Sequence, residues 1–178
     1  MNEDELYVLF CCIASYSCAP YGECSVSTLE EMLKSPLLHC GNYGLLAIQL
    51  AIAGYPDIEK KVQVHAVTWN NGPFGVHQTL FLHRSHDDGI FIDPTCGYVA
   101  VASFNEVASG KPIPKHRIYD YSNRADIAVF RRKVYNALVN GECRPSQILA
   151  YFKSPLKHDV YYKTIYKGDC WLPTPAAK

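Results

Sequence analysis

Three residues of the chain have types and contexts that suit nucleophilic catalysis: Cys40, His77 and Asp93. Cys40 opens the run CGNYGLLAIQLAIAG (40–54), and between residues 43 and 53 Gln49 is the only strongly polar side chain. A helix that is apolar on nearly all sides is a buried helix, and this one is too short to span a bilayer. The N–H groups and the dipole at a helix N-terminus favour negative charge, so we expect the Cys40 thiol to be shifted toward the nucleophilic thiolate.

His77 and Asp93 lie in two predicted strands on either side of a polar turn. The midpoint of their positions is residue 85, inside the run RSHDDG (84–89). A hairpin that closes there makes the two residues cross-strand neighbours, and their even separation puts both side chains on one face of the sheet. A carboxylate in that place can orient an imidazole, and the imidazole can deprotonate a thiol for attack on an acyl carbon.

Each of these residues also has an ordinary structural explanation. Cysteine is commonly buried as a small hydrophobe, and the chain holds eight cysteines. An aspartate before a proline is a frequent turn feature. Seven histidines are present, and those close enough in sequence to compete with His77 are His65, His83 and His86. The order and conjunction of the three residues, rather than any one of them, therefore support the hypothesis.

The elements that must position these residues are predicted as helices followed by an antiparallel meander. Residues 27–30 form a capping-box pattern that opens a short helix to about Lys34, and residues 40–53 form the buried helix. A further helix is expected within residues 3–17. β-Branched and alternating runs between turn-rich segments predict three strands, over 61–69, 76–83 and 90–95.

The C-terminal part gives weaker signals. The spacing of apolar residues predicts a helix over 126–140 that ends at Gly141, and Pro145 at a first-turn position predicts another over 145–153. One or two helical turns are expected at 104–109, a strand within 158–166 and a disordered tail from Leu172.

We therefore expect an α+β fold in which the buried helix packs on an antiparallel sheet, with a helical C-terminal extension. Residues 1–100 are expected to form the core, residues 101–171 an extension packed on the same domain, and residues 172–178 a tail.

Composition limits the function classes. The chain has 17 basic and 17 acidic residues, which argues against a nucleic-acid partner because phosphate binding demands a basic face. No stretch reaches transmembrane length, so no membrane partner is expected. The first residues are acidic before their apolar run, unlike a signal peptide, and we expect a cytoplasmic protein with mostly reduced cysteines. No metal or other cofactor is expected, because common zinc-ligand spacings are absent.

Residues 28–97 resemble the transglutaminase-like superfamily of papain-fold cysteine enzymes. The resemblance rests on the Cys-Gly-Asn-Tyr-Gly start of the buried helix, the Gly-Tyr-Pro turn after it, and the Ile-Asp-Pro-Thr motif (92–95) that closes the strand after that of His77. It implies a papain-like core in which Cys40 is the nucleophile, His77 the general base and acid, and Asp93 the orienting carboxylate.

A tetrahedral intermediate at such a site needs hydrogen-bond donors for its oxyanion. The backbone N–H of Cys40 is one expected donor. A second could come from one of three tyrosines, among which the sequence selects none: Tyr7, Tyr16 or Tyr21. Further candidates for oxyanion or substrate-binding roles are Asn42, Tyr43 and Gln78.

The sequence thus supports a cysteine-dependent acyl-transfer enzyme that works through a thioester on an amide, peptide or small acyl substrate. Hydrolysis and amine transfer are not distinguished, since they differ in whether water or an amine reaches the acyl-enzyme. The alternative is a catalytically inactive transglutaminase-like domain that binds a peptide or protein partner. A third interpretation makes the protein an accessory or effector whose basic C-terminal side chains, including residues 131–133, bind a partner. A solvated face is the favoured explanation of these charges, because a chain of zero formal net charge has no strong steering field.

Overall fold

The structure is a computed structural model, and it describes part of the chain. The described residues are 21–22, 28–54, 63–85, 88–121, 124–142, 144–150, 163–167 and 170–174. The helix expected within residues 3–17 lies outside them. Among the described residues, no helix combines the length and the apolar character needed to cross a membrane.

Short helices and one buried helix frame the site. The described helices are α2 (Leu29–Lys34), α3 (Cys40–Gly54), α4 (Phe104–Ser109), α5 (Ala128–Asn140) and the 3₁₀ turn η2 (Lys115–Arg117). In the capping box of α2, Thr28 Oγ1 accepts the N–H of Glu31 at 3.2 Å and the Glu31 carboxylate accepts the N–H of Thr28 at 3.0 Å. The box therefore lies one residue later than predicted, while the predicted buried helix is confirmed as α3.

One antiparallel sheet runs through the molecule. Its strands are β1 (Gln63–Gly72), β2 (Gly75–Ser85), β3 (Asp88–Asp93), β4 (Tyr98–Val101), β5 (Ile118–Asp120), β6 (Gln147–Ala150), β7 (Lys163–Lys167) and β8 (Cys170–Thr174). Their order across the sheet is β5-β4-β3-β2-β1-β6-β7-β8, with every neighbouring pair antiparallel. The fold is therefore α+β, and the predicted meander is confirmed as β1–β3.

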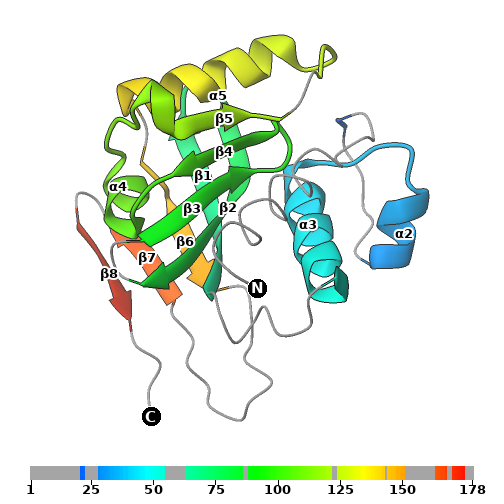
Figure 1. Ribbon diagram of the computed structural model, residues 1–178, viewed down its shortest axis with the longest axis horizontal. Helices are drawn as coiled ribbons and strands as arrows, with labels where there is room; N and C mark the ends of the chain where they lie inside the picture. The colour runs from blue at the N-terminus through cyan, green and yellow to red at the C-terminus, as the bar shows by residue number, and fades with distance from the viewer. Residues whose placement is uncertain are drawn as a thin grey trace.

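Helices cover both faces of the sheet where β2 runs through it (Figure 1). On one face lies α3, where a Cβ on Gly44 would lie 3.5 Å from Leu80. On the other face, Phe81 belongs to a core cluster with Phe104 of α4 and Val134 of α5. Successive side chains of a strand point to opposite faces, so neighbouring residues of β2 contact different helical layers.

The pairing of β2 with β3 differs in register from the prediction. Leu80 lies opposite Ile92, which puts Asp93 level with Thr79 rather than with His77. The reason is that the hairpin closes later than predicted, with Ser85 opposite Asp88, and the irregularity between His83 and Ser85 takes back only one residue of this shift. The shared face is confirmed by their contact, because His77 and Asp93 are diagonal neighbours whose side chains meet.

The helix predicted over 145–153 is wrong. Residues 147–150 form β6, which pairs with β1 so that Ile148 lies opposite Val67. Both side chains are fully buried or nearly so and belong to the core cluster. Residues 147–150 thus form a strand because they pair with β1 and bury Ile148, and these tertiary contacts outweigh the local helix signal of Pro145.

The last described strands also change the expected C-terminal part. The strand expected within 158–166 is confirmed as β7 for residues 163–167, and residues 158–162 lie outside the described part. The tail expected from Leu172 is instead part of β8 as far as Thr174. The C-terminal extension is therefore helical only in part, because its strands join the same sheet.

Two glycines with positive φ give a matched test of how closely the end of α5 packs on residues 110–112. Gly141 ends α5 with φ +67°, and a Cβ there would lie 2.7 Å from the carbonyl oxygen of Gly110 and 2.7 Å from Pro112 Cδ. Gly75 has φ +75°, but a Cβ there would meet nothing within 4 Å.

Left-handed strain should cost each alanine variant about 1 to 2 kcal/mol of unfolding free energy. Gly141→Ala should lose a further 1 to 3 kcal/mol, roughly, through overpacking. Urea denaturation of both variants measures the difference. Equal losses would contradict the close approach of Gly141 to the 110–112 segment.

Candidate active site

Cys40 lies at the first position of α3, next to an imidazole that caps the helix. Nδ1 of His39 accepts the backbone N–H groups of Gly41 at 3.1 Å and Asn42 at 3.3 Å. In return, Oδ1 of Asn42 accepts the N–H of His39 at 3.3 Å. This is the reciprocal arrangement of a capping box, built here with histidine and asparagine. The N–H of Cys40 takes no part in this cap.

The Cys40 thiol is acidified by groups of β2. Burial by itself raises the pKa of the thiol, but interaction with the imidazole of His77 and with the backbone N–H of Gln78 outweighs burial. The pKa of Cys40 is therefore lowered from its ordinary value. The N-terminus of α3 favours the same charge. The nucleophilic form predicted from the sequence thus has support from both the helix and the sheet.

His77 and Asp93 form a fully buried hydrogen-bonded pair. Nε2 of His77 lies 2.7 Å from Oδ2 of Asp93, and neither side chain has exposed surface. Oδ1 of Asp93 accepts the N–H of Cys96 at 2.9 Å, which fixes the carboxylate within its own turn. Burial by itself lowers the pKa of the imidazole, but Asp93 outweighs burial and raises it to about 9.

The second nitrogen of the imidazole is left for the nucleophile. Within the described residues, Nδ1 of His77 has no hydrogen-bond partner of ordinary geometry. The Cys40 thiol is the group that acts on the ring besides Asp93. The thiol acts on the imidazole through a looser hydrogen bond and through charge, and both lower the pKa of Cys40 and raise that of His77. The imidazole therefore lies between the thiol and the carboxylate.

Aromatic rings shield the imidazole from water. The ring centroids of Phe74 and Phe130 lie 5.6 Å and 5.0 Å from that of His77, both nearly perpendicular to it. Next to His77 on the same face of β2, Thr79 accepts a hydrogen bond from Trp69 Nε1 at 3.0 Å. An environment with little water strengthens the interactions among the charged groups.

Tyr21 is brought next to Cys40 from a distant part of the chain. The N–H of Gly22 donates to the carbonyl oxygen of Leu38 at 3.1 Å, and the ring of Tyr21 stacks on Phe130 with centroids 6.0 Å apart. Burial, and then the negative charge of Cys40, raise the pKa of the Tyr21 hydroxyl, which hydrogen-bonds the Cys40 side chain. The phenol thus keeps its proton at neutral pH beside the sulfur.

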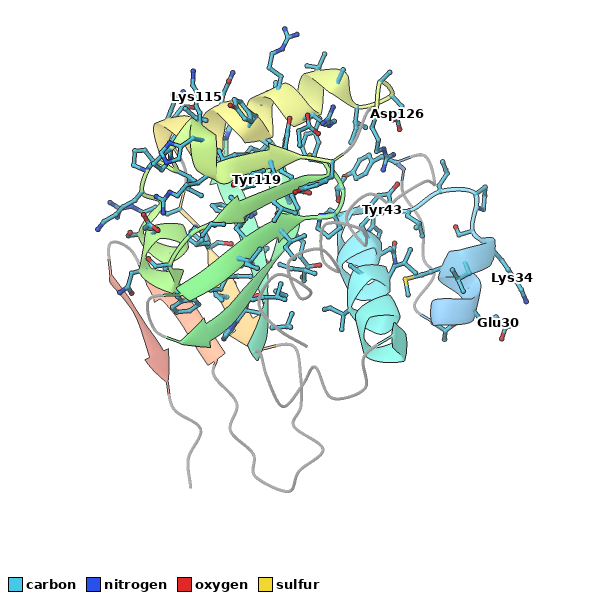
Figure 2. The ribbon with its side chains drawn as sticks, in the orientation of Figure 1. Glu30, Lys34, Tyr43, Lys115, Tyr119 and Asp126 are labelled. Atoms are coloured by element: carbon cyan, nitrogen blue, oxygen red, sulfur yellow. The ribbon has the colours of Figure 1, made fainter. Side chains whose placement is uncertain are left out.

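Tyr43 has a supporting position rather than one at the sulfur. Its side chain is buried, and its hydroxyl accepts a hydrogen bond from Arg124 Nη1 at 2.7 Å. The guanidinium carbon of Arg124 lies 5.0 Å from the ring centroid of Tyr43. Figure 2 shows Tyr43 at the N-terminal end of α3, on the side of the segment that carries Asp126. This tyrosine therefore ties α3 to the residues before α5.

The other candidates from the sequence act through their backbone or cannot be placed. Gln78 stabilises the Cys40 thiolate through its N–H, and its side chain lies over Gly41, where a Cβ would be 2.8 Å from Oε1. Asn42 belongs to the cap of α3. Two of the candidate tyrosines, Tyr7 and Tyr16, lie outside the described residues.

Arg131 holds the site through a contact that the sequence analysis did not predict. Nε of Arg131 donates to the carbonyl oxygen of Cys96 at 2.8 Å, and its guanidinium carbon lies 5.2 Å from the ring centroid of Tyr98. Arg131 thus ties α5 to the turn that carries Asp93. The sequence signal was its place in the helical spacing of Val134 and Leu138, which puts an arginine on the apolar face of α5.

Three side chains of metal-ligand type also meet at this site. The ligand atoms of His77, Asp93 and Cys96 lie within 4.8 Å of one another. Two of these groups already hydrogen-bond each other, and burial, together with Asp93, raises the pKa of the Cys96 thiol. A metal ion in this place would have to displace the short bond between His77 and Asp93, so the contacts present are those of a hydrogen-bonded pair.

Comparisons of the chain with models of known families, with curated proteins and with solved structures find no match. What the site can do follows from its chemistry. A thiolate, an imidazolium and a carboxylate in sequence at the start of β2 are suited to attack on an acyl carbon.

The pKa shifts predict how Cys40 reacts with iodoacetamide. Because its pKa is lowered, Cys40 should be alkylated faster at pH 6 than an ordinary thiol, and its rate should fall as the pH drops through that lowered value. In His77→Ala the thiolate loses its imidazolium partner while burial remains, so the pKa of Cys40 should rise. A rise of roughly one pKa unit lowers the thiolate fraction, and with it the rate at pH 6, about tenfold. Peptide mass spectrometry from pH 5 to 9, roughly spanning the ordinary value, measures the rates.

The matched control is His116→Ala, which removes an exposed histidine of η2 and should leave the profile unchanged. A wild-type profile centred near pH 8.5, about the value of an unperturbed thiol, and indifferent to His77 would contradict the ion pair.

Proposed function

We propose that the chain is a cysteine-dependent acyl-transfer enzyme that forms a thioester on Cys40 with an amide, peptide or small acyl substrate. The observation that carries this proposal is the buried pair of His77 and Asp93 beside a thiol whose pKa the same imidazole lowers. Burying two ionisable groups is costly unless their polar atoms are satisfied, and catalytic sites are where such perturbed groups gather.

The three residues have distinct roles in the proposed reaction. The Cys40 sulfur attacks the acyl carbon, and the carbonyl oxygen takes up the displaced electron pair. When the intermediate collapses, the leaving group takes the proton from Nδ1 of His77 and the acyl group remains on sulfur. Water or an amine, deprotonated by His77, then attacks the thioester and releases the acid or a new amide. Asp93 orients the ring and stabilises the imidazolium without taking the proton.

Two donors are available for the oxyanion. The N–H of Cys40 lies at the N-terminus of α3, and the Tyr21 hydroxyl lies beside the sulfur. The hydrogen bond from the Tyr21 hydroxyl to the Cys40 side chain supports this role, because it places a phenol that is protonated at neutral pH beside the reacting sulfur. We therefore select Tyr21 among the candidate tyrosines as the second donor.

The transglutaminase-like, papain-like assignment is part of the same proposal. Its support is that α3, which carries Cys40, packs on β2, and that His77 and Asp93 lie on the adjacent antiparallel strands β2 and β3. Residues 28–97 contain all of these elements. A thiol that must stay reduced also fits the cytoplasmic location that the sequence suggests.

A chromogenic ester tests the proposal directly. With p-nitrophenyl acetate, the wild-type chain should release a rapid burst of p-nitrophenolate and carry one acetyl group on Cys40 by peptide mass spectrometry. Cys40→Ala should lose the burst and keep its thermal unfolding midpoint. The buried Cys96 is an internal control in the same digest, because its raised pKa should leave it unmodified.

Acetylation of Cys40 no faster than in the urea-unfolded chain would contradict catalysis. That outcome would favour the alternative, an inactive domain of this kind that binds a peptide or protein partner.

Tyr21→Phe separates oxyanion stabilisation from thiol reactivity. Acylation by the ester passes through an oxyanion, whereas alkylation by iodoacetamide does not. The ratio of the acylation rate to the alkylation rate at Cys40 should therefore fall about 100-fold in Tyr21→Phe. The control Tyr119→Phe changes an exposed tyrosine of β5 and should keep the wild-type ratio. An unchanged ratio in Tyr21→Phe would show that another group binds the oxyanion.

A further inference from the structure

A pocket of about 400 Å³ lies between the β1–β2 turn and the first turn of α5. Pro73 and Phe74 line it from the turn, and Ile127, Val129 and Phe130 line it from the start of α5. Small-ligand sites have volumes of about 300 to 1,000 Å³. The hollow is therefore large enough to hold one bulky group.

The pocket shares its wall with the catalytic pair. Phe74 and Phe130 line it and also contact the imidazole of His77, with ring centroids at 5.6 Å and 5.0 Å. The two phenylalanine rings meet edge to face at 6.2 Å, and Phe130 also stacks on Tyr21, the neighbour of Cys40. A group seated in the pocket is thus one layer of rings away from the catalytic residues.

The lining favours an uncharged, apolar group. Val129 presents an apolar side chain that is 72% exposed. Both charge signs occur at the pocket, from Asp126 and Lys133, so a carboxylate would face the first and an ammonium the second. The Asp126 carboxylate is also engaged already, by Arg124 at 2.8 Å and by the backbone N–H of Tyr21. An apolar group can instead gain contact with Val129 and the phenylalanine rings without displacing these bonds.

We propose that this pocket binds a bulky apolar side chain of the acyl substrate, seated on Phe74 and Phe130 while the acyl carbon reaches Cys40. The inference rests on the proposed acyl-transfer function and narrows its substrate class to compounds with a large apolar group near the reacting carbonyl. The pocket residues of α5 lie outside the region of family resemblance, so this preference is a property of this chain's own C-terminal part.

Two chloroacetamides test the pocket independently of catalysis. N-phenethylchloroacetamide and N-methylchloroacetamide react with Cys40 in the same way, since the sulfur forms a bond to carbon and chloride leaves. The ratio of their second-order rate constants at Cys40, divided by the same ratio for free cysteine, reports the contribution of the apolar group. We expect this corrected ratio to be about tenfold in the wild type, as partial burial of one aromatic ring predicts.

Val129→Asp should bring the corrected ratio close to one. Val129 is exposed and lies in the first turn of α5, where an acidic side chain interacts favourably with the helix dipole, so the fold should be kept. Val101→Asp is the matched control, because Val101 is an exposed valine on β4 that does not line the pocket. It should keep the wild-type ratio, and circular dichroism checks that both variants are folded.

A wild-type ratio near one, or a ratio that Val129→Asp leaves unchanged, would overturn the pocket assignment. Slow reaction of Cys40 with both reagents at a preserved tenfold ratio would contradict the activated thiol and still support the pocket. The two proposals therefore fail in different ways.

Discussion

The buried contact between His77 and Asp93 is the constraint on which the rest of the site depends. Neither side chain has exposed surface, so each polar atom must find its partner inside the protein. Asp93 meets this demand with Oδ2 on the imidazole and Oδ1 on the N–H of Cys96. β3 therefore has to end at Asp93, in a turn that brings the Cys96 amide back to the carboxylate. Asp93 leaves one ring nitrogen of His77 unused, and the Cys40 thiol acts on the same ring.

The alternation of β2 explains how two helical layers meet at one site. Gln78 faces α3, where its side chain lies over Gly41, and His77 faces α5, where its ring lies against Phe130. Consecutive residues of one strand thus contact the layer that carries the nucleophile and the layer that excludes water. Cys40 can reach both because it lies at the end of α3 that adjoins the start of β2.

The segment that leads into α5 holds the site from outside residues 28–97, which contain Cys40, His77 and Asp93. Arg131 fixes the carbonyl oxygen of Cys96, and Arg124 fixes Tyr43 of α3. Asp126, paired with Arg124, holds the backbone of Tyr21, whose hydroxyl lies beside the sulfur. The same segment lines the apolar pocket. The groups proposed for oxyanion binding and for substrate selection therefore both depend on this segment, while Cys40, His77 and Asp93 lie on α3, β2 and β3.

The sequence by itself determined the parts of the site that rest on local periodicity and local chemistry. The apolar run after Cys40 predicted α3, and alternation predicted β1–β3 with His77 and Asp93 on one face, because helix and strand periods are properties of a few consecutive residues. Only the tertiary structure decided the register of β2 on β3, the strand of residues 147–150, and the places of Tyr21 and Arg131. These depend on partners far away in the chain. β1 supplies the ladder that makes residues 147–150 a strand, and the turn after Asp93 supplies the carbonyl oxygen that Arg131 binds. Such contacts leave no periodic trace in the sequence, since their free energy arises only when distant segments pack together.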